Sequence, residues 1–305
     1  MGKRRRKNRG PFLWGLFLLS FSAGLISALY LVRFGWLDEF IPVRERVITR
    51  YVPAPKEPPE AKPPEARPPV ARVPGRVDGR VDEKRYAKVA IVIDDMGQDM
   101  KGLRGLLEVN APITIAVLPH LKFSREVARE ASLKGREVLL HLPMEPKGTD
   151  YNNPGEGALL TAMNEEDIRS TIAGDLMEVP GAVGVNNHMG SRFTEDEARM
   201  RAVLDVVRKN KLFFLDSRTS SMSVGTRLAK EMGIKNIGRN VFLDNNRDHQ
   251  YIKAQLKELV AIAKKKGKAV GIGHPYPETI EVLQEMVPEL KGQGVTVVKL
   301  SELVE

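Results

Sequence analysis

The chain has 305 residues, enough for one large domain or two ordinary ones. Lysine and arginine total 48 against 39 aspartates and glutamates, but six of the basic residues lie in the first ten positions. The rest of the chain therefore carries a net charge of only +3, which argues against a basic nucleic-acid-binding surface on the folded part. The absence of cysteine excludes disulfides, thiolate nucleophiles, Cys-ligated zinc and iron–sulfur clusters.

The first predicted element is a membrane anchor. Residues 12–32 contain no charge, and about 20 apolar residues suffice to cross a bilayer as a helix. The preceding basic cluster stays in the cytoplasm by the positive-inside rule. We therefore expect a basic cytoplasmic N-terminus (1–10), a transmembrane helix (11–33) and a C-terminal part outside the cytoplasmic membrane, in the periplasm or its equivalent. A long cleavable signal peptide and a buried core helix are the alternatives.

A proline-rich linker is predicted next, over residues 34–86. Nine prolines lie between Pro53 and Pro74 among Lys, Glu, Ala and Arg. Proline favours extended, semi-rigid chain, so this segment is typical of a spacer between an anchor and a folded domain. A docking site for a proline-recognition domain is the alternative.

Strands and helices then alternate over residues 87–305, the predicted folded domain. Predicted strands span 89–93, 113–118, 138–140, 182–185, 212–215, 237–243, 270–272 and 295–300. Predicted helices span 100–109, 123–134, 165–178, 195–209, 224–232, 249–266 and 278–290. This alternation predicts an α/β fold with a parallel sheet, either a distorted (β/α) barrel or, as the alternative, a doubly wound open sheet.

Polar side chains follow most of the predicted strands. They are Asp94, Asp95, His120, His141, His188, Asp216, Asp244 and His274. The carboxyl ends of parallel strands meet at one rim, so we expect these groups to lie near one another. His249 is expected away from the rim, in the first turn of a helix.

These residue types suit metal-assisted hydrolysis. Of two adjacent carboxylates, Asp94 and Asp95, one can bind a metal while the other takes a proton. His141 and His188 are zinc-type ligands, and two histidines with one carboxylate form a catalytic type of zinc site. His274 can protonate a leaving group. A serine hydrolase is disfavoured because no G-x-S-x-G segment occurs.

Five segments in chain order make the pattern more specific. They are Ile93-Asp94-Asp95-Met96-Gly97, His141-Leu-Pro-Met-Glu145-Pro146, Asn187-His188-Met-Gly190-Ser191, Phe214-Leu-Asp216-Ser217-Arg218 and Ile272-Gly273-His274-Pro275. Together they resemble the divergent polysaccharide deacetylase family of bacterial envelope proteins. The wider superfamily consists of metal-dependent carbohydrate esterases on a distorted (β/α) barrel, and the resemblance covers residues 87–305.

The resemblance implies roles for several residues. In the wider superfamily the first Asp of an Asp-Asp pair is the general base and the second binds the metal, which by position are Asp94 and Asp95. A His-x-x-x-His motif supplies two further ligands and a late histidine is the general acid, so His141 matches the first ligand and His274 the acid. Asp216, within the fourth segment, is a third catalytic candidate.

Two departures from the superfamily pattern affect the metal site. Glu145 stands where the second metal histidine is expected, and Asn186-Asn187-His188-Met189-Gly190 replaces the usual Arg-Pro-Pro segment. We expect His188 to restore the second imidazole from a neighbouring strand. Glu145 would then be a further ligand or would contact one.

The predicted function is removal of acetyl groups from an envelope polysaccharide or peptidoglycan-type glycan, assisted by a divalent metal, zinc. Asp94 would be the base and His274 the acid. The alternative is a glycan-binding or scaffold protein of the cell envelope that has lost turnover. The expected partners are the acetylated glycan and the inner membrane, with no nucleic acid. The sequence does not identify a protein partner.

Overall fold

The computed structural model describes residues 86–148 and 153–305. Its strands are β1 (Ala87–Met96), β2 (Thr114–Val117), β3 (Val138–Met144), β4 (Ala182–Met189), β5 (Phe213–Asp216), β6 (Asn236–Gly238), β7 (Val241–Phe242), β8 (Lys268–Gly273) and β9 (Val295–Val297). Its α-helices are α2 (Lys101–Leu107), α3 (Ser124–Leu133), α4 (Glu165–Glu178), α5 (Glu197–Lys209), α6 (Gly225–Glu231), α7 (His249–Lys266) and α8 (Pro277–Met286). The 3-10 helices are η2 (Phe193–Glu195), η3 (Val287–Glu289) and η4 (Leu300–Glu302).

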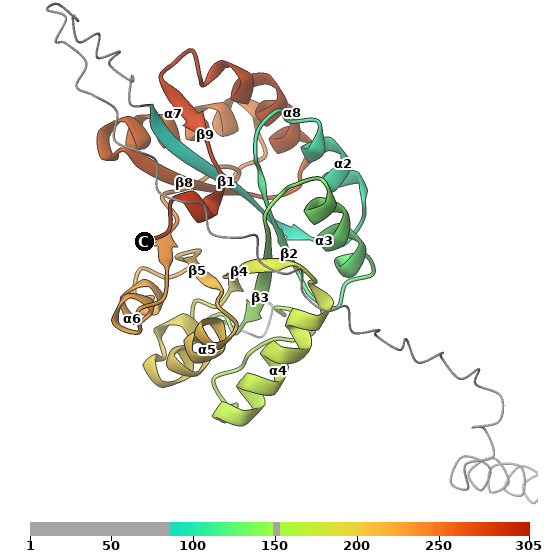
Figure 1. Cartoon of the computed structure of the whole chain (residues 1–305), viewed down its shortest axis with the longest axis vertical. Coiled ribbons are helices and arrows are strands. Elements are labelled where there is room, and N and C mark those ends of the chain that lie inside the picture. Colours follow the sequence, from blue (N-terminus) through green and yellow to red (C-terminus); the bar gives the residue numbers. More distant parts are fainter. Residues whose placement is uncertain (1–85, 149–152) are drawn as a thin grey trace, which may run out of the picture. The chain divides into compact units, whose positions relative to one another are not determined.

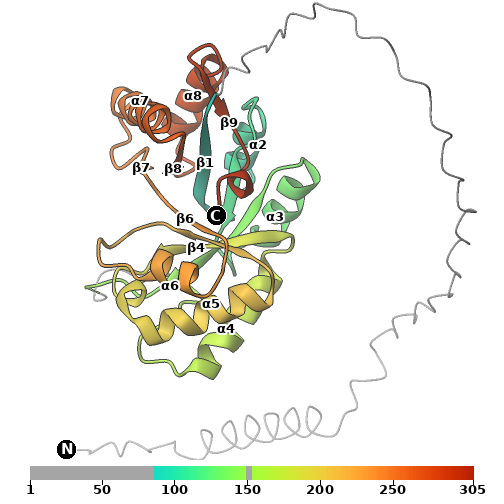
Figure 2. The ribbon, with the colours of Figure 1, turned by 60° about the vertical axis from the view of Figure 1, so that its left-hand side comes forward.

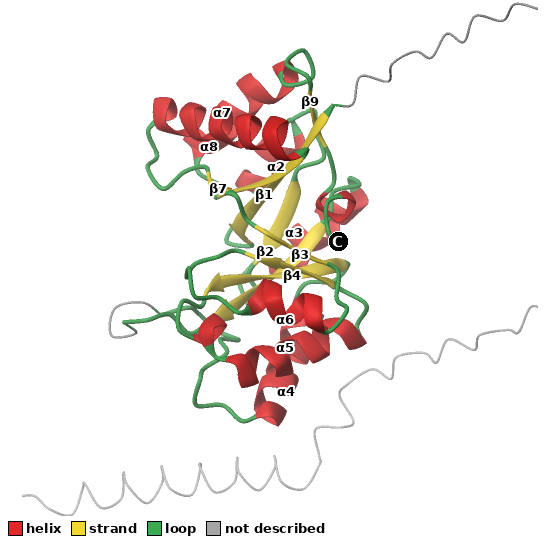
Figure 3. Cartoon of the chain, turned by 90° about the vertical axis from the view of Figure 1, so that its left-hand side faces the viewer, coloured by secondary structure: helices red, strands yellow, loops and turns green. Residues whose placement is uncertain are grey.

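The strands form one parallel sheet in the order β6-β5-β4-β3-β2-β1-β8-β7, and β9 pairs with the start of β1. Every strand pair is parallel, as the alternation of strands and helices predicts. Figure 1 shows the helices outside the curled sheet. Figure 3 shows α7 and α8 against one part of it and α4, α5 and α6 against the other. The fold is a curled (β/α) half-barrel.

The two edges of the sheet are joined by a single stretch of chain. We predicted one strand over residues 237–243, but the structure has two, β6 on the edge of β5 and β7 on the edge of β8. Between them Arg239 donates its N–H to the Asp216 carbonyl and Asn240 donates to the Val270 carbonyl. In the described ranges no ladder pairs β6 with β7, so the predicted barrel is incompletely closed (Figure 2).

Two apolar clusters cover the two faces of the sheet. Side chains alternate along a strand, so residues two apart share a face. Leu139, Leu215 and Ile272 belong to the cluster on the inner, concave face. A larger cluster on the outer face includes Ile91, Leu140 and Phe214 and packs against the helices.

Local capping explains why two helices begin where the pattern predicts. The Asn164 side chain accepts hydrogen bonds from the backbone at the start of α4, and Asp248 does the same for α7. Gly267, with φ +83°, ends α7 in a left-handed conformation that glycine adopts without strain. The predicted bounds of both helices, 165–178 and 249–266, are confirmed.

The predicted anchor and proline-rich linker lie outside the described residues. Among the helices that are described, none has the length and apolar character needed to cross a bilayer.

Candidate metal centre

The alternation of side chains directs several polar groups to the inner face at one rim of the sheet. On β1, Asp94 follows the inward-facing Val92, and on β3, His141 follows Leu139. His274 follows Ile272 at the end of β8 by the same step of two. Period-2 alternation therefore places the three polar side chains beyond the apolar cluster of the inner face.

Asp95 reaches the same site through an irregularity in its strand. In a regular strand Asp95 would face away from Asp94. The pairing of β1 with β2 shifts between Ile93 and Met96, and Asp95 has φ +57°, a left-handed conformation that is uncommon for non-glycine residues. Such strained conformations cost about 1–3 kcal/mol and cluster at functional sites. Because of this irregularity, the carboxylates of Asp94 and Asp95 can both face the same site although the two residues are adjacent in sequence.

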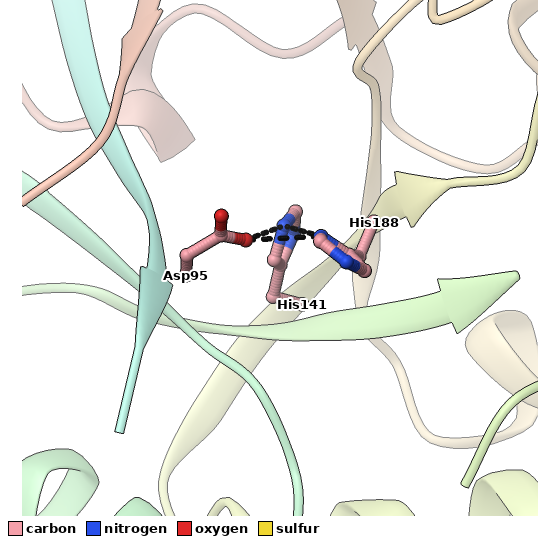
Figure 4. A group of neighbouring side chains, drawn as sticks. All are labelled: Asp95, His141 and His188. Carbon is pink, nitrogen blue, oxygen red and sulfur yellow. Dashed lines mark hydrogen bonds and ion pairs between the residues drawn. The ribbon is translucent and has the colours of Figure 1, made fainter. Parts of the chain in front are cut away.

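Three side chains from three strands converge at this rim (Figure 4). The Asp95 Oδ1 atom lies 3.1 Å from His141 Nε2 and 2.9 Å from His188 Nδ1. The two imidazole nitrogens are 3.1 Å apart. His141 is buried, while His188 and Asp95 are partly exposed. The structure thus brings together the three residues predicted as metal ligands, in a group that could hold an ion.

The spacing of these three atoms fits a zinc-type ion. Zinc–nitrogen and zinc–carboxylate distances near 2.0 Å imply ligand atoms about 3.3 Å apart in a tetrahedron. Two imidazoles and one carboxylate are also a donor set found in catalytic zinc sites. The residues present therefore fit the metal that the resemblance implies.

The register of β3 and β4 explains how His188 reaches His141. His141 pairs with Asn186 and Pro143 pairs with His188, so His188 stands two residues beyond the partner of His141. Residues two apart in β4 share a face, and the imidazole rings meet edge to face with centroids 4.9 Å apart.

Asp94 lies beside the group and is held by an amide. Asn186 Nδ2 donates to Asp94 Oδ1 at 2.9 Å, and Asp94 Oδ2 lies 3.6 Å from His141 Nε2. Burial raises the pKa of Asp94, although the neighbouring His141 opposes the shift. A buried carboxylate of raised pKa is a stronger base than an exposed one.

His274 lies on the other side of Asp95, with Nε2 3.9 Å from Asp95 Oδ2. Its Nδ1 contacts Asp244 Oδ1 at 2.8 Å, and the other Asp244 oxygen accepts from the His274 backbone and the Thr279 hydroxyl. Burial opposes protonation of His274, but Asp244 outweighs it and raises the pKa to about 9. At neutral pH His274 therefore carries a proton that Nε2 can present to the site.

The charges of the three grouped side chains are coupled. Burial disfavours the ionised form of Asp95, but its contacts with His141 and His188 outweigh this effect and lower its pKa. Burial also disfavours a charged His141, yet Asp94 and Asp95 raise its pKa. The site therefore combines an ionised Asp95 with two neighbouring imidazoles.

Glu145 does not join this group, contrary to our prediction. Residues 141–144 are extended in β3, and a rise of about 3.3 Å per residue separates His141 from Glu145 by about 13 Å. Both Glu145 oxygens contact other residues: Oε2 accepts from the backbone and hydroxyl of Thr161, and Oε1 lies 3.3 Å from Arg192 Nη1. Glu145 therefore anchors the loop after β3.

Asp216 does not face the group either. Its Oδ1 accepts from the Arg218 backbone, and its Oδ2 accepts from the Ser223 hydroxyl and from Thr226 at the start of α6. The carboxylate is thus used to shape the loop between β5 and α6.

The remaining histidines lie apart from this group. His120 Nε2 contacts the buried Asp175 of α4 at 2.8 Å. His249 opens α7 and pairs with Glu281, away from the rim as predicted.

Sequence reasoning missed the supporting roles of three residues, namely Asn186, Asp244 and Thr279. Asn186 is two positions before His188 in the same strand, so its inward direction followed from the alternation. Asp244 was recognised as a rim residue, but its contact with His274 joins positions 30 apart in sequence.

The fold and the site define a (β/α) protein with a metal-type Asp/His/His group at the carboxyl rim of its sheet. The sequence model of the divergent polysaccharide deacetylase family matches residues 91–304, and the chain belongs to that family.

Relatives of similar sequence occur in bacteria. YibQ of Escherichia coli K12, described as uncharacterized, is 38% identical over 218 residues, covering 71% of this chain and 67% of YibQ. An uncharacterized protein of Haemophilus influenzae Rd is 36% identical over 198 residues, covering 65% of this chain and 70% of that protein. The crystal structure of an uncharacterized Agrobacterium tumefaciens C58 protein aligns with a TM-score of 0.69 and 27% identity, covering 72% and 90% of the two chains.

Proposed function

We propose that this protein is a zinc-dependent hydrolase that removes acetyl groups from a glycan of the cell envelope. The observation that carries the proposal is the convergence of Asp95 Oδ1, His141 Nε2 and His188 Nδ1 within 3.1 Å of one another. Membership of a family named for polysaccharide deacetylation supports the reaction class.

Asp95, His141 and His188 would hold the ion. When bound, a zinc ion polarises a carbonyl oxygen and lowers the pKa of a water molecule. Asp95 neutralises part of the ionic charge, and the two imidazoles leave room for further ligands.

Asp94 would be the general base. Its Oδ1 is fixed by Asn186, which leaves Oδ2, 3.6 Å from His141 Nε2, directed at the centre of the group. An attacking water at this position gives its proton to Oδ2. The raised pKa of Asp94 favours that transfer.

His274 would be the general acid, acting from the opposite side of Asp95. Asp244 fixes its ring through Nδ1 and keeps it protonated at neutral pH. Nε2 can therefore give its proton to the amine or alcohol that leaves when the acetyl group is removed. The base and the acid approach the substrate from two sides of the same group.

The same proposal places the domain in the cell envelope. Residues 12–32 are long and apolar enough for an anchor, and the nine prolines between Pro53 and Pro74 suit a spacer that holds a domain away from the membrane. An acetylated glycan such as peptidoglycan is a substrate that an anchored enzyme can reach there.

Acetate release tests the reaction directly. The full chain, supplied with zinc, should release acetate from acetylated chito-oligosaccharides or from peptidoglycan fragments. Asp94→Asn is the matched control because it removes the base with little change of shape. No release above that control, at high protein concentration and from every glycan, would contradict catalysis.

A glycan-binding scaffold without turnover is the competing function. The observation that favours it is that the two imidazoles and Asp95 lie at hydrogen-bonding distance, so they can form a structural group without an ion. Metal analysis of the purified chain separates the two functions. About one tightly bound ion per chain supports the enzyme, whereas a chain that binds glycan but retains no ion supports the scaffold.

A further inference from the structure

Two arginines lie side by side at the edge of the site. Arg239 occupies the crossing between β6 and β7. Its Nε donates to the Ser217 carbonyl at 2.7 Å, and its Nη2 donates to the Arg218 carbonyl at 3.0 Å. These bonds hold the guanidinium across the open edge of the sheet.

The Arg218 guanidinium lies next to it and packs against Gly238. A Cβ at Gly238 would meet Arg218 Nε at 2.4 Å and displace the side chain. Arg218 Nη1 also donates to the Arg239 carbonyl at 3.4 Å. Arg218 itself has φ +49°, a strained conformation for a residue with a side chain.

Among the described residues neither guanidinium forms an ion pair, although the charges of Asp216 and Asp94 favour the charged form of Arg239. Within residues 86–148 and 153–305, no carboxylate oxygen lies within 4.0 Å of either guanidinium. Burial and the nearby charge of Arg218 lower the pKa of Arg239 by more than Asp216 and Asp94 raise it, so the charged form of Arg239 is disfavoured. Arg239 Nη1 and Arg218 Nη2 also have no hydrogen-bond acceptor among the described groups.

The pair is connected to both proton-transfer residues. Ser217, whose carbonyl binds Arg239, receives at its hydroxyl a hydrogen bond from Asn186, the residue that holds Asp94. On the other side, the Phe242 ring lies 3.6 Å from Arg239 Cζ and is stacked on His274 with centroids 6.4 Å apart. β6, β7 and β8 can be followed around this edge in Figure 2.

We propose that Arg218 and Arg239 bind an oxyanion carried by the substrate, so that the glycan is acidic as well as acetylated. This inference rests on the proposed function and names its substrate class. A guanidinium presents N–H groups in a fork that matches a carboxylate or phosphate. An oxyanion between the two arginines would relieve their repulsion and satisfy the free N–H groups.

Binding of defined sugars to the full chain tests the proposal without requiring turnover. The probes are the disaccharide of N-acetylglucosamine and N-acetylmuramic acid, the same disaccharide with its carboxylate methylated, and N-acetylglucosamine 6-phosphate beside unphosphorylated N-acetylglucosamine. We expect the anionic sugar of at least one pair to bind about tenfold or more tightly than its neutral partner, with a dependence on salt. If only N-acetylglucosamine 6-phosphate binds more tightly than its neutral partner, the substrate is a phosphorylated glycan. If only the disaccharide with a free carboxylate does so, the substrate is a carboxylated glycan.

Substitutions at the two arginines complete the test. Arg218→Gln and Arg239→Gln should each abolish most of the preference, and Arg239→Lys should restore part of it. Arg239→Gln also removes hydrogen bonds to the loop after β5, so Arg218→Gln, a change at an exposed side chain, is the decisive variant if the other unfolds. Arg129→Gln, at an exposed arginine on α3, is the matched control and should leave the preference unchanged.

Equal binding of anionic and neutral sugars, or no binding of any of them, overturns the proposal. So does a preference that survives Arg218→Gln in a folded chain. Failure of the deacetylase reaction gives a different result: anion-dependent binding persists while acetate release by the parent chain equals that of Asp94→Asn.

Discussion

His188 Nδ1 lies 3.1 Å from His141 Nε2, although the residue paired with His141 in the β3–β4 ladder is Asn186. The two imidazoles that face the candidate metal position therefore come from neighbouring strands. In the pattern of the wider superfamily they are four residues apart in one segment. Glu145 stands where that pattern has its second histidine, and in the described part of the chain the second imidazole of the group comes from His188 on the neighbouring strand.

The first prediction concerns this metal group. Asp95→Ala, His141→Ala and His188→Ala each remove one of three ligands. Zinc affinity, measured by competition with a chelating dye, should therefore fall by more than the 10–100-fold typical of residues that only contact a ligand.

Two variants serve as controls for that measurement. Glu145→Gln should leave the affinity unchanged because Glu145 contacts Thr161 and Arg192 instead of the group. His249→Ala should also have no effect, since His249 pairs with Glu281 on the helices. Unchanged zinc affinity in His188→Ala would show that the second imidazole is not a ligand.

The second prediction separates the base from the residue that holds it. Asp94→Asn should keep zinc affinity close to that of the parent and lower kcat by about 10²–10⁴-fold, the usual contribution of general base catalysis. Asn186→Ala should lower kcat less, because the carboxylate remains but loses the amide that orients it. Steady-state kinetics with zinc titrations on the same samples check both. A larger loss in Asn186→Ala than in Asp94→Asn would contradict the assignment of Asp94 as the base.

The third prediction concerns the stability of the fold between pH 4 and 7. Burial raises the pKa of Asp175 from 3.8 to about 7, and the contact with His120 only partly offsets this. The folded chain then binds a proton more tightly than the unfolded chain, so the free energy of unfolding should fall as pH rises from about 4 to about 7. Each unit by which the pKa of Asp175 differs between the folded and the unfolded chain changes the free energy of unfolding by about 1.4 kcal/mol.

Asp175→Asn isolates this contribution because asparagine keeps the shape without the charge. Urea unfolding of the variant should show a flatter dependence on pH than the parent. Glu166→Gln, at an exposed acid on the same helix, should follow the parent. If Asp175→Asn and the parent lose the same stability over this range, another group is responsible.

The fourth prediction concerns the anchor at residues 12–32. A periplasmic reporter fused after Glu305 should be active, because the basic cluster before the apolar segment keeps the N-terminus in the cytoplasm. Membrane fractions should retain a chain that still contains residues 12–32, as judged by N-terminal sequencing. A soluble product beginning near Gly35 would show that the segment is a cleaved signal peptide.

Several features of this protein follow from local sequence alone. The bounds of α4 and α7 depend on side-chain caps and apolar spacing within one segment, so they were predictable to the residue. The alternation of strands and helices likewise predicted the parallel sheet and the rim at which Asp94, His141 and His274 meet. Each of these conclusions depends on residues close together in the chain or on a general rule of parallel sheets.

Other features depend on which strands become neighbours, and only the tertiary structure decides that. The register of β3 against β4 brings His188 to His141, and the extension of β3 takes Glu145 away from it. A backbone irregularity turns Asp95 toward His141 and His188, and the crossing from β6 to β7 sets Arg239 beside Arg218. The physical reason is that register and curvature are set by the packing of the whole sheet and its helices, whereas a sequence pattern reports only the direction of a side chain within its own strand.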